Sequence, residues 1–433
     1  MDNVLNQLDN LQITGDACQE RLWSSYIDLI QKTYVPEYNE GTVRPGKDDF
    51  NNFRTVAEKN LRKIRSMMNQ IIRNRNDTNM PINFNSPILK RLATDLLLLV
   101  GEHNEKSIWN TEECVSISME IITSFLAFYG YESTSQYLMD QDNWTMLLIT
   151  LRPKLLKDTW RRYPAAVSCY KWIIQQVQEP SLYIHIDIVL PTALIIIDDF
   201  VPEYVVLGLE CLHLIVQHSR MKKGLVETGY GEMILHALER VIRERDHRHV
   251  PLAFSCMSDV ISTLEYWDSN LNVFGWTQRD NTLAILLDNM EFQQDVQLRR
   301  AYMQNLRQFL TNIACVKWGE RLTRILSEYC EQYTDLTTLK ATLETAKVFL
   351  MMFQLRIASH CVPLYTAFIK LHFDLTETPV FDNEIMQNLE DCIYLLYRLS
   401  PNVGSAVMND DRMRLVIKNS LRMICLNDTK YFE

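Results

Sequence analysis

The only tight group of histidines in the sequence is the tetrapeptide Asp246-His247-Arg248-His249, with His236 upstream and Cys256 downstream. Imidazole, thiolate and carboxylate groups are the ligands that zinc takes in proteins, so a metal centre is the chemistry that these residues would serve. The spacing does not support it, because the group has neither an HExxH motif nor paired CxxC motifs. We therefore interpret the tetrapeptide as a solvated turn between helices and expect no metal site.

Two further groups could bind phosphate or act in catalysis, and neither has the required context. Gly229-Tyr230-Gly231 precedes an expected helix, but a dinucleotide-binding loop also needs a third glycine and a preceding strand. Asp198 and Asp199 form a carboxylate pair, yet adjacent side chains point in different directions and rarely share one substrate. We expect no catalytic residue, no cofactor and no enzymatic activity. A metal-dependent hydrolase using these carboxylates or the His247 group is the alternative, which metal analysis of the purified chain would test.

A third group is suited to binding rather than to catalysis. In Leu298-Arg299-Arg300-Ala301-Tyr302, two arginines stand beside an aromatic residue at the start of an expected helix. Arginine and tyrosine are enriched among the residues that dominate binding energy in protein interfaces. We predict that Arg299, Arg300, Tyr302 and Asn305 contact a partner protein. In the alternative interpretation, an arginine here bonds a corner carboxylate of a neighbouring repeat, such as Asp288 or Asp199.

The charge of the chain argues against nucleic acid as that partner. The 433 residues carry a formal net charge of −10, and an acidic chain lacks the general electrostatic footprint of a nucleic-acid-binding protein. The densest basic run, residues 54–75, holds Arg54, Lys59, Arg62, Lys63, Arg65 and Arg73. We interpret this run as the solvated face of a helix.

The cysteines and the N-terminus indicate an intracellular protein. The ten cysteines occur singly and none forms a CxxC pair, which fits a reducing compartment better than a disulfide framework. The N-terminus lacks the charged-then-apolar pattern of a signal peptide. The longest apolar run, residues 188–197, is half the length of a membrane-spanning helix. We expect a protein of the cytoplasm and nucleus that does not enter the membrane.

These groups must be positioned by helices. Only 12 glycines and 13 prolines occur, and apolar residues recur at steps of three and four, which is the helical period. Residues 182–197, 234–242, 283–290, 322–333 and 364–375 read as first helices of five pairs. The second helices begin near Val205, Val250, Val296, Leu339 and Ile385. A helical hairpin recurring about every 45 residues predicts a HEAT/armadillo-like α-solenoid, in which neighbouring hairpins stack to bury their apolar faces.

Weaker helical patterns extend this organisation toward the N-terminus. Residues 88–100 read as a first helix, and residues 114–128 and 165–177 as second helices. We assign residues 1–87 to an N-terminal helical region with polar loops at about 36–52 and 74–87, and residues 88–433 to the solenoid. We expect the first ~85 residues to pack only loosely against it.

One stretch of the predicted solenoid resembles a known family. It runs from Val189-Leu190-Pro191-Thr192 through Asp198-Asp199 and Pro202-Glu203 to the run Leu207-Gly208-Leu209-Glu210-Cys211-Leu212-His213. This stretch is similar to the signature block of the Tti-two (Tel-two-interacting protein two) family. Tyr163-Pro164 upstream and the Leu298–Tyr302 segment with Asn305-Leu306 downstream resemble further family blocks. The resemblance extends from about residue 163 to residue 310, more faintly to 399, and leaves residues 1–110 unmatched.

The resemblance implies an α-solenoid subunit of the Triple T complex, together with Tel-two-like and Tti-one-like proteins. That complex works with the ninety-kilodalton heat-shock chaperone and its cochaperones. It supports the folding, stability and assembly of phosphatidylinositol-kinase-related kinases, including those of TOR signalling and the DNA damage response. Members are not enzymes and take no cofactor. The alternative is a HEAT-repeat adaptor of another kind, for nuclear transport or as a phosphatase scaffold, since a fold does not fix its function.

Overall fold

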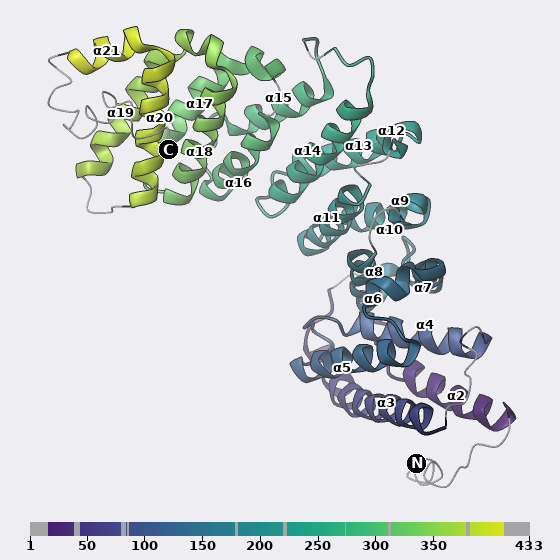
Figure 1. The fold of residues 1–433 in the computed structure, drawn as a ribbon. Coiled ribbons are helices and arrows are strands. Elements are labelled where there is room, and N and C mark those ends of the chain that lie inside the picture. The colour runs from purple at the N-terminus through teal and green to yellow at the C-terminus, as the bar shows by residue number, and fades with distance from the viewer. Residues whose placement is uncertain are drawn as a thin grey trace. The chain divides into compact units, whose positions relative to one another are not determined.

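The computed structural model describes residues 16–38, 44–78, 84, 86–177, 181–219, 223–272, 274–310, 313–377 and 382–410. Over these ranges the regular structure consists of α-helices joined by turns and short 3-10 helices, and no strand occurs. The helices pack as antiparallel pairs that stack on one another, which confirms the predicted all-α, HEAT/armadillo-like α-solenoid (Figure 1).

The chain divides into two compact units. Unit 1 comprises Met1–Asp198 with Gln217–Ser219, and unit 2 comprises Asp199–Val216 with Arg220–Glu433. The boundary predicted after residue 87 falls inside unit 1. The division into two units does not test whether residues 1–87 form a separate domain, so that boundary stays a prediction.

Unit 1 begins with long helices and continues with short ones. Its α-helices are α2 (Asp16–Gln31), α3 (Asn51–Thr78), α4 (Pro87–Glu102), α5 (Glu112–Tyr129), α6 (Thr134–Met139), α7 (Asn143–Leu151), α8 (Pro164–Gln176), α9 (Ser181–Ile184) and α10 (Ile186–Ile197). The 3-10 helices η1 (Asp48–Phe50), η2 (Asp140–Asp142), η3 (Arg152–Lys154) and η4 (Trp160–Arg162) lie between them. Helix α2 packs on α4, α3 on α5, and α4 also on α8. The predicted helices at 88–100, 114–128 and 165–177 correspond to α4, α5 and α8.

The expectation that the first ~85 residues pack loosely is wrong. Ala57, Leu61 and Ile64 place one apolar face of α3 fully in the interior, against α5. Ahead of α3, Val35 and Phe50 join a small core with Trp109 and Ala165. Helix α3 is polar overall, but its apolar residues are spaced so that they fall on one face, and that face is buried.

The two predicted polar loops are shorter than expected where the structure describes them. Asn74–Thr78 still belong to α3, because asparagine and aspartate each weaken a helix by less than about 1 kcal/mol and the first proline after Ile72 is Pro81. The earlier loop ends at η1, where Asp48 and Asp49 lie in the first turn and favour it electrostatically. Residues 39–43, 79–83 and 85 of the two loops lie outside the described residues.

Unit 2 is a regular stack of helical hairpins. Its helices are α11 (Pro202–Gln217, whose last residue is counted with unit 1), α12 (Gly224–Glu227), α13 (Tyr230–Arg243), α14 (Val250–Trp267), α15 (Gln278–Met290), α16 (Val296–Leu306), α17 (Gly319–Glu331), α18 (Leu336–Met352), α19 (Cys361–Glu377), α20 (Asn383–Leu399) and α21 (Pro401–Asn409), with η5 (Arg307–Phe309), η6 (Ile313–Trp318) and η7 (Gln354–Ser359). Second helices form one layer in the order α14, α16, α18 and α20, and first helices form the other as α15, α17 and α19.

Aspartates start three consecutive second helices of unit 2. The Asp295, Asp335 and Asp382 side chains accept hydrogen bonds from backbone N–H groups in the first turns of α16, α18 and α20. A capping carboxylate satisfies an otherwise unpaired donor and also favours the positive end of the helix dipole. The sequence therefore sets these three hairpin corners locally, by one aspartate in each.

Two parts of the predicted helix pattern need correction. The helix predicted over 182–197 is divided into α9 and α10 at His185, whose backbone is not helical (φ −113°, ψ 29°). Helices α6 and α7 were not predicted, because neither exceeds nine residues and too few turns exist to show a clear period.

Candidate protein-binding surfaces

The structure places three of the four predicted partner-binding residues in the interior of unit 2. Arg299, Tyr302 and Asn305 are buried on α16, and only Arg300 reaches solvent. A buried side chain offers no surface to a partner, so a contact role remains a prediction only for Arg300. The sequence pattern missed this because arginine next to tyrosine indicates a binding hot spot only when both are exposed.

Arg299 fixes the corner between α15 and α16. Its guanidinium carbon lies 3.8 Å from the centroid of the Tyr329 ring, and its Nη1 donates a hydrogen bond to the Gln293 carbonyl oxygen at 2.9 Å. The Glu328 carboxylate lies 3.5 Å away. Stacking on an aromatic face together with bonding to a carbonyl oxygen makes this buried cation a structural element of the hairpin stack.

Arg300 joins two successive hairpins. Its Nη2 donates to Oδ1 of Asp335 at 2.9 Å, and Asp335 is the aspartate that caps α18. This agrees with the alternative interpretation that an arginine here bonds a corner carboxylate of a neighbouring repeat, although the carboxylate is that of Asp335. Asn305 acts within its own helix, where it donates to the Ala301 carbonyl oxygen at 2.8 Å.

Polar side chains cross-link α11 to α14, η5 to α18 and α18 to α20 in unit 2. The pairs are His213–Asp259 at 2.9 Å, Arg307–Glu344 at 3.0 Å, Lys340–Glu384 at 2.6 Å and Lys347–Asp391 at 2.5 Å. Two of these pairs, Arg307–Glu344 and Lys340–Glu384, are exposed, and exposed ion pairs each contribute at most about 1 kcal/mol, so these two set register more than they stabilise the stack. Much of the charge on this layer is thus engaged within the chain.

The residues considered for metal or phosphate chemistry do not form a site. Among the described residues, no group of three or more His, Cys, Asp or Glu side chains could hold a metal ion. Arg248 bonds Asp246 at 2.7 Å in a turn before α14, while His249 is buried beside the Pro202 carbonyl oxygen. Gly229 has a left-handed backbone (φ +72°) at the turn that starts α13, which glycine adopts readily.

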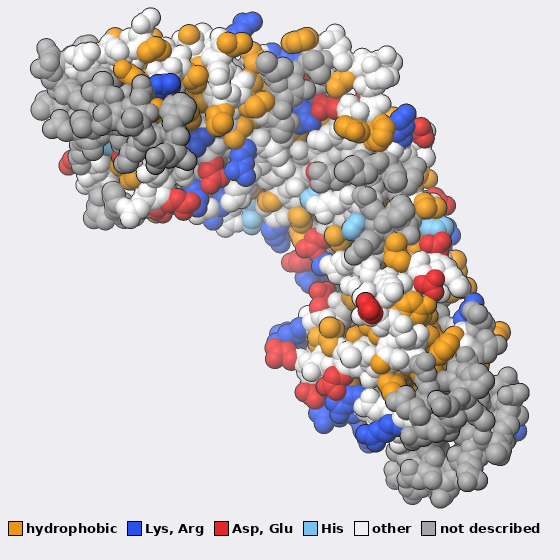
Figure 2. Space-filling model, viewed as in Figure 1, with side chains coloured by type: hydrophobic (Ala, Val, Ile, Leu, Met, Phe, Trp, Pro, Cys, Tyr) orange, Lys and Arg blue, Asp and Glu red, His pale blue; other side chains and the backbone are white. Residues whose placement is uncertain are grey.

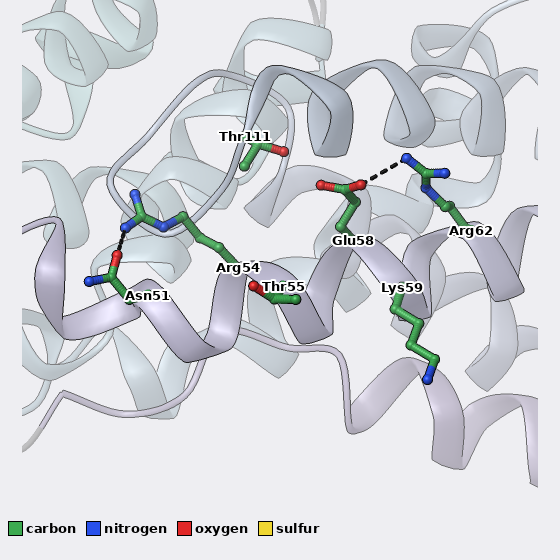
Figure 3. A pocket seen from close by; sticks show the side chains of 7 residues that line it. All are labelled: Asn51, Arg54, Thr55, Glu58, Lys59, Arg62 and Thr111. Atoms are coloured by element: carbon green, nitrogen blue, oxygen red, sulfur yellow. Dashed lines mark hydrogen bonds and ion pairs between the residues drawn. The ribbon is translucent and has the colours of Figure 1, made fainter.

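The basic run on α3 borders a hollow of about 680 Å³ in unit 1 (Figure 3). Arg54 bonds Asn51, and Arg62 bonds Glu58 at 2.8 Å on the same helix and Glu113 of α5 at 3.3 Å. In Figure 3, Lys59 points away from Thr111, which starts α5. Since Arg65 also bonds Glu120 of α5 at 2.9 Å, the run acts as the expected solvated helix face and fastens α3 to α5.

Unit 1 contains a buried polar network that the sequence did not indicate. The Val35 backbone N–H donates to the Glu102 carboxylate at 2.8 Å, and Lys154 lies 3.6 Å from the other oxygen of that carboxylate. Nearby, the Tyr34 hydroxyl donates to the Asp95 carbonyl and carboxylate oxygens at 3.0 and 3.1 Å. These bonds fasten the segment after α2 to α4. No sequence signal marks them, because the partners stand 52 to 67 residues apart.

Burial shifts the pKa values of Glu102 and of two other buried groups in unit 1. It raises the pKa of Glu102 to about 7, against smaller opposing effects of Lys154 and the Val35 N–H. Burial also lowers the pKa of His103 to about 4 and raises the pKa of the Cys169 thiol well above its usual value. Shifted carboxyl groups can serve in acid–base catalysis, but Glu102 is almost fully buried and its oxygens face groups of the chain itself. The network is therefore structural.

A surface that sequence reasoning missed lies on unit 2. A hollow of about 690 Å³ is lined by Phe274, Val316, Lys317 and the stretch 351–356 at the end of α18 and the start of η7. Phe274 is 81% exposed and Leu355 is 94% exposed, and Met351 is also exposed. On the face of unit 2 drawn in Figure 2, several hydrophobic side chains lie at the surface over α17. No periodic signal could have found this surface, since its residues come from loops and helix ends.

The rim of this hollow is held in place by a polar and aromatic cluster. Lys317 Nζ donates to the Gly275 carbonyl oxygen at 2.7 Å and to Asp280 at 2.5 Å, and Trp318 Nε1 donates to Asp280 at 2.8 Å. Burial would raise the pKa of Asp280, but these bonds together lower it. The Trp276 ring lies 5.6 Å from that of Trp318. Gly275 and Trp276, which follow Phe274 in the chain, thus contact Lys317 and Trp318 of η6.

No single helix of the described residues is both long and apolar enough to cross a membrane. A bent pair, Glu112–Tyr129 with Thr134–Lys154, meets the requirement only by length and composition.

Comparisons with known proteins agree with the resemblance seen in the sequence. The model of the Tti2 family matches residues 149–242. TELO2-interacting protein 2 from Homo sapiens is 28% identical over 330 residues, which cover 72% of this chain and 64% of the relative. The protein of that name from Rattus norvegicus is 27% identical over 326 residues, covering 71% and 63%. The predicted resemblance to the Tti2 family is confirmed. The aligned part spans less than two thirds of the length of these relatives.

Most residues of the signature run in the Tti2-like segment are buried by helix packing. Gly208, Leu209, Cys211 and Leu212 of α11 are buried. His213 reaches Asp259 of α14 at 2.9 Å. The run Leu-Gly-x-x-Cys-Leu-His thus serves chiefly to stack one helix on the next.

Solved structures give only weak matches to this Tti2-like chain. An engineered protein aligns over 98% of both chains with a TM-score of 0.45 and 10% identity. A complex of SYS-1 with POP-1 aligns over 97% of this chain and 80% of the other, with a TM-score of 0.45 and 14% identity.

Proposed function

We propose that this chain is a non-enzymatic scaffold subunit of a Triple T complex, in which it binds Tel-two-like and Tti-one-like proteins. The similarity to TELO2-interacting protein 2 carries the proposal, since the printed name of those relatives states an interaction with TELO2. In the complex, the chain supports the folding, stability and assembly of phosphatidylinositol-kinase-related kinases, together with the heat-shock chaperone and its cochaperones.

The stacked hairpins support a scaffold role because they offer a large surface to a partner. Stacked hairpins bury their apolar faces against each other, and each added hairpin extends the solvent-facing area of the stack. An obligate interface with a large helical partner needs about 2,000 Å² or more, which such a surface can supply. The charged side chains that join hairpins and the buried network of unit 1 are used inside the chain, and neither forms a reaction site.

Affinity purification of the tagged chain from cell extract, followed by mass spectrometry, tests the proposal. We expect Tel-two-like and Tti-one-like proteins in amounts comparable with the chain, and the heat-shock chaperone and the kinases in smaller amounts. Recovery of transport cargo or a phosphatase without the two Triple T proteins would contradict the proposal and favour a different adaptor. Stoichiometric zinc, iron or manganese in the purified chain would revive the alternative of a metal-dependent hydrolase.

A further inference from the structure

The apolar hollow of unit 2 combines exposed apolar side chains with positive charge. Its described lining contains two cations, Lys317 and Arg356, and no Asp or Glu. Lys317 is engaged by Asp280, whereas the exposed guanidinium of Arg356 has no hydrogen bond or ion pair within the described residues. In a chain of net charge −10, this is a local positive site beside exposed apolar side chains.

We propose that this hollow binds an amphipathic segment of a partner protein, with large apolar side chains against Phe274 and Leu355 and an acidic side chain on Arg356. The inference rests on the proposed function, because it assigns the surface by which the scaffold holds its partner. Exposed apolar patches rimmed by polar groups mark protein-interaction sites.

Charge complementarity selects this occupant over two others. The chain's own residues 411–433 contain five Lys or Arg and three Asp or Glu, so this segment brings excess positive charge to a positive site. A second copy in a two-fold dimer would place the same surface against itself, and with it Arg356 near Arg356. An acidic partner segment instead gives the guanidinium the carboxylate that it lacks.

Two matched substitutions test the surface. Phe274→Asp and Phe292→Asp introduce the same charge at aromatic residues of unit 2 that are 81% and 84% exposed, and Phe292 does not line the hollow. Aspartate also tolerates the left-handed backbone of Phe292 (φ +60°). The affinity of each variant for the reconstituted pair of Tel-two-like and Tti-one-like proteins is measured by titration. We expect Phe274→Asp to weaken binding at least about 10-fold and Phe292→Asp to change it less than about 2-fold.

Further variants test the chemistry of the occupant. Leu355→Asp should repeat the loss and guards against a folding defect of Phe274→Asp, since Leu355 is almost fully exposed. Arg356→Glu should weaken binding about 5- to 10-fold, whereas Arg356→Lys should retain most of it.

The outcomes separate this inference from the proposed function. If the wild type binds the pair and Phe274→Asp, Leu355→Asp and Arg356→Glu bind equally well, the surface assignment is overturned and the proposed function stands. A wild-type dimer in light scattering that Phe274→Asp dissociates would identify a second copy as the occupant, which also overturns it. If the wild type does not bind the pair, the proposed function is contradicted and this inference falls with it.

Discussion

Unit 1 and unit 2 reach the same all-α architecture by different means. In unit 2, hairpins of similar length stack in two layers, aspartates cap successive second helices, and ion pairs join each hairpin to the next. In unit 1, four long helices are followed by shorter ones, and a buried network around Glu102 fastens the segment after α2 to α4. Regular repetition therefore accounts for unit 2, whereas unit 1 also depends on specific polar contacts between segments distant in sequence.

The largest expected effect is the loss of stability when a buried aromatic residue of unit 2 is truncated, compared with an exposed one. Phe254 is fully buried against Tyr302 and Phe309, so Phe254→Ala should lower the free energy of unfolding by about 3–5 kcal/mol. Phe274→Ala should change it by less than about 0.5 kcal/mol, because Phe274 is exposed. Denaturant unfolding monitored by circular dichroism measures both, and equal losses would contradict the assignment of the two side chains.

The next prediction concerns the two adjacent arginines of α16. Arg299→Ala removes a buried stacking contact with Tyr329 and leaves the Gln293 carbonyl oxygen without its donor, so we expect a loss of about 2–4 kcal/mol. Arg300→Ala removes a half-exposed pair with Asp335 and should cost less than about 1 kcal/mol. If thermal unfolding shows Arg300→Ala to be the more damaging change, Arg299 does not fix the hairpin corner as described.

A pH-dependent prediction distinguishes unit 1. Burial raises the pKa of Glu102 from 4.5 to about 7, so between these values the folded chain binds more protons at this group than the unfolded chain does. Its contribution to stability therefore falls as the pH rises from 4.5 to 7 and stays constant above 7. Glu102→Gln removes this dependence but keeps an oxygen for the Val35 N–H. The stability of the variant relative to wild type should rise over that range by up to about 3 kcal/mol.

Unfolding measured from pH 4 to pH 8 checks this difference. His103, whose burial lowers its pKa to about 4, acts in the opposite direction, but it is present in both proteins and its contribution is common to them. Glu113→Gln makes the same substitution at an exposed ion pair of unit 1 and serves as the control. A variant-minus-wild-type difference that does not change with pH would show that Glu102 is not buried as an ionisable group.

The smallest effects are expected for surface ion pairs, and here the two units should agree. Arg65→Ala breaks the bond from α3 to Glu120 in unit 1, and Arg307→Ala breaks the bond to Glu344 in unit 2. Each should lower the free energy of unfolding by less than about 1 kcal/mol, because both pairs are exposed to solvent. A loss above 2 kcal/mol in either unit would indicate that these pairs, rather than apolar burial, hold neighbouring helices together.

The same contrast explains what the sequence could predict. The repeated hairpins of unit 2 follow from apolar residues at helical spacing, and the starts predicted at Val250 and Val296 coincide with the first residues of α14 and α16. Helices α6 and α7 are too short to show a period, and the break at His185 depends on a single backbone conformation. Local patterns thus sufficed where each helix supplies several turns of one apolar face.

The candidate surfaces were less predictable, because exposure is a property of the folded chain. Arg299 and Tyr302 have the composition of an interface and lie in the core, whereas Phe274 and Leu355 lie in irregular segments and form the exposed apolar hollow. The Glu102 carboxylate and the Val35 N–H that it accepts from are brought together only by the packing of α2 on α4. Such contacts could not be read from spacing along one helix.

The most direct measurement of the scaffold role uses purified components. The chain is mixed with Tel-two-like and Tti-one-like proteins, and the molar mass of the product is determined by size-exclusion chromatography with light scattering. We predict a single species whose mass equals the sum of the three proteins. Elution of this chain apart from the other two, while they bind each other, would contradict the account.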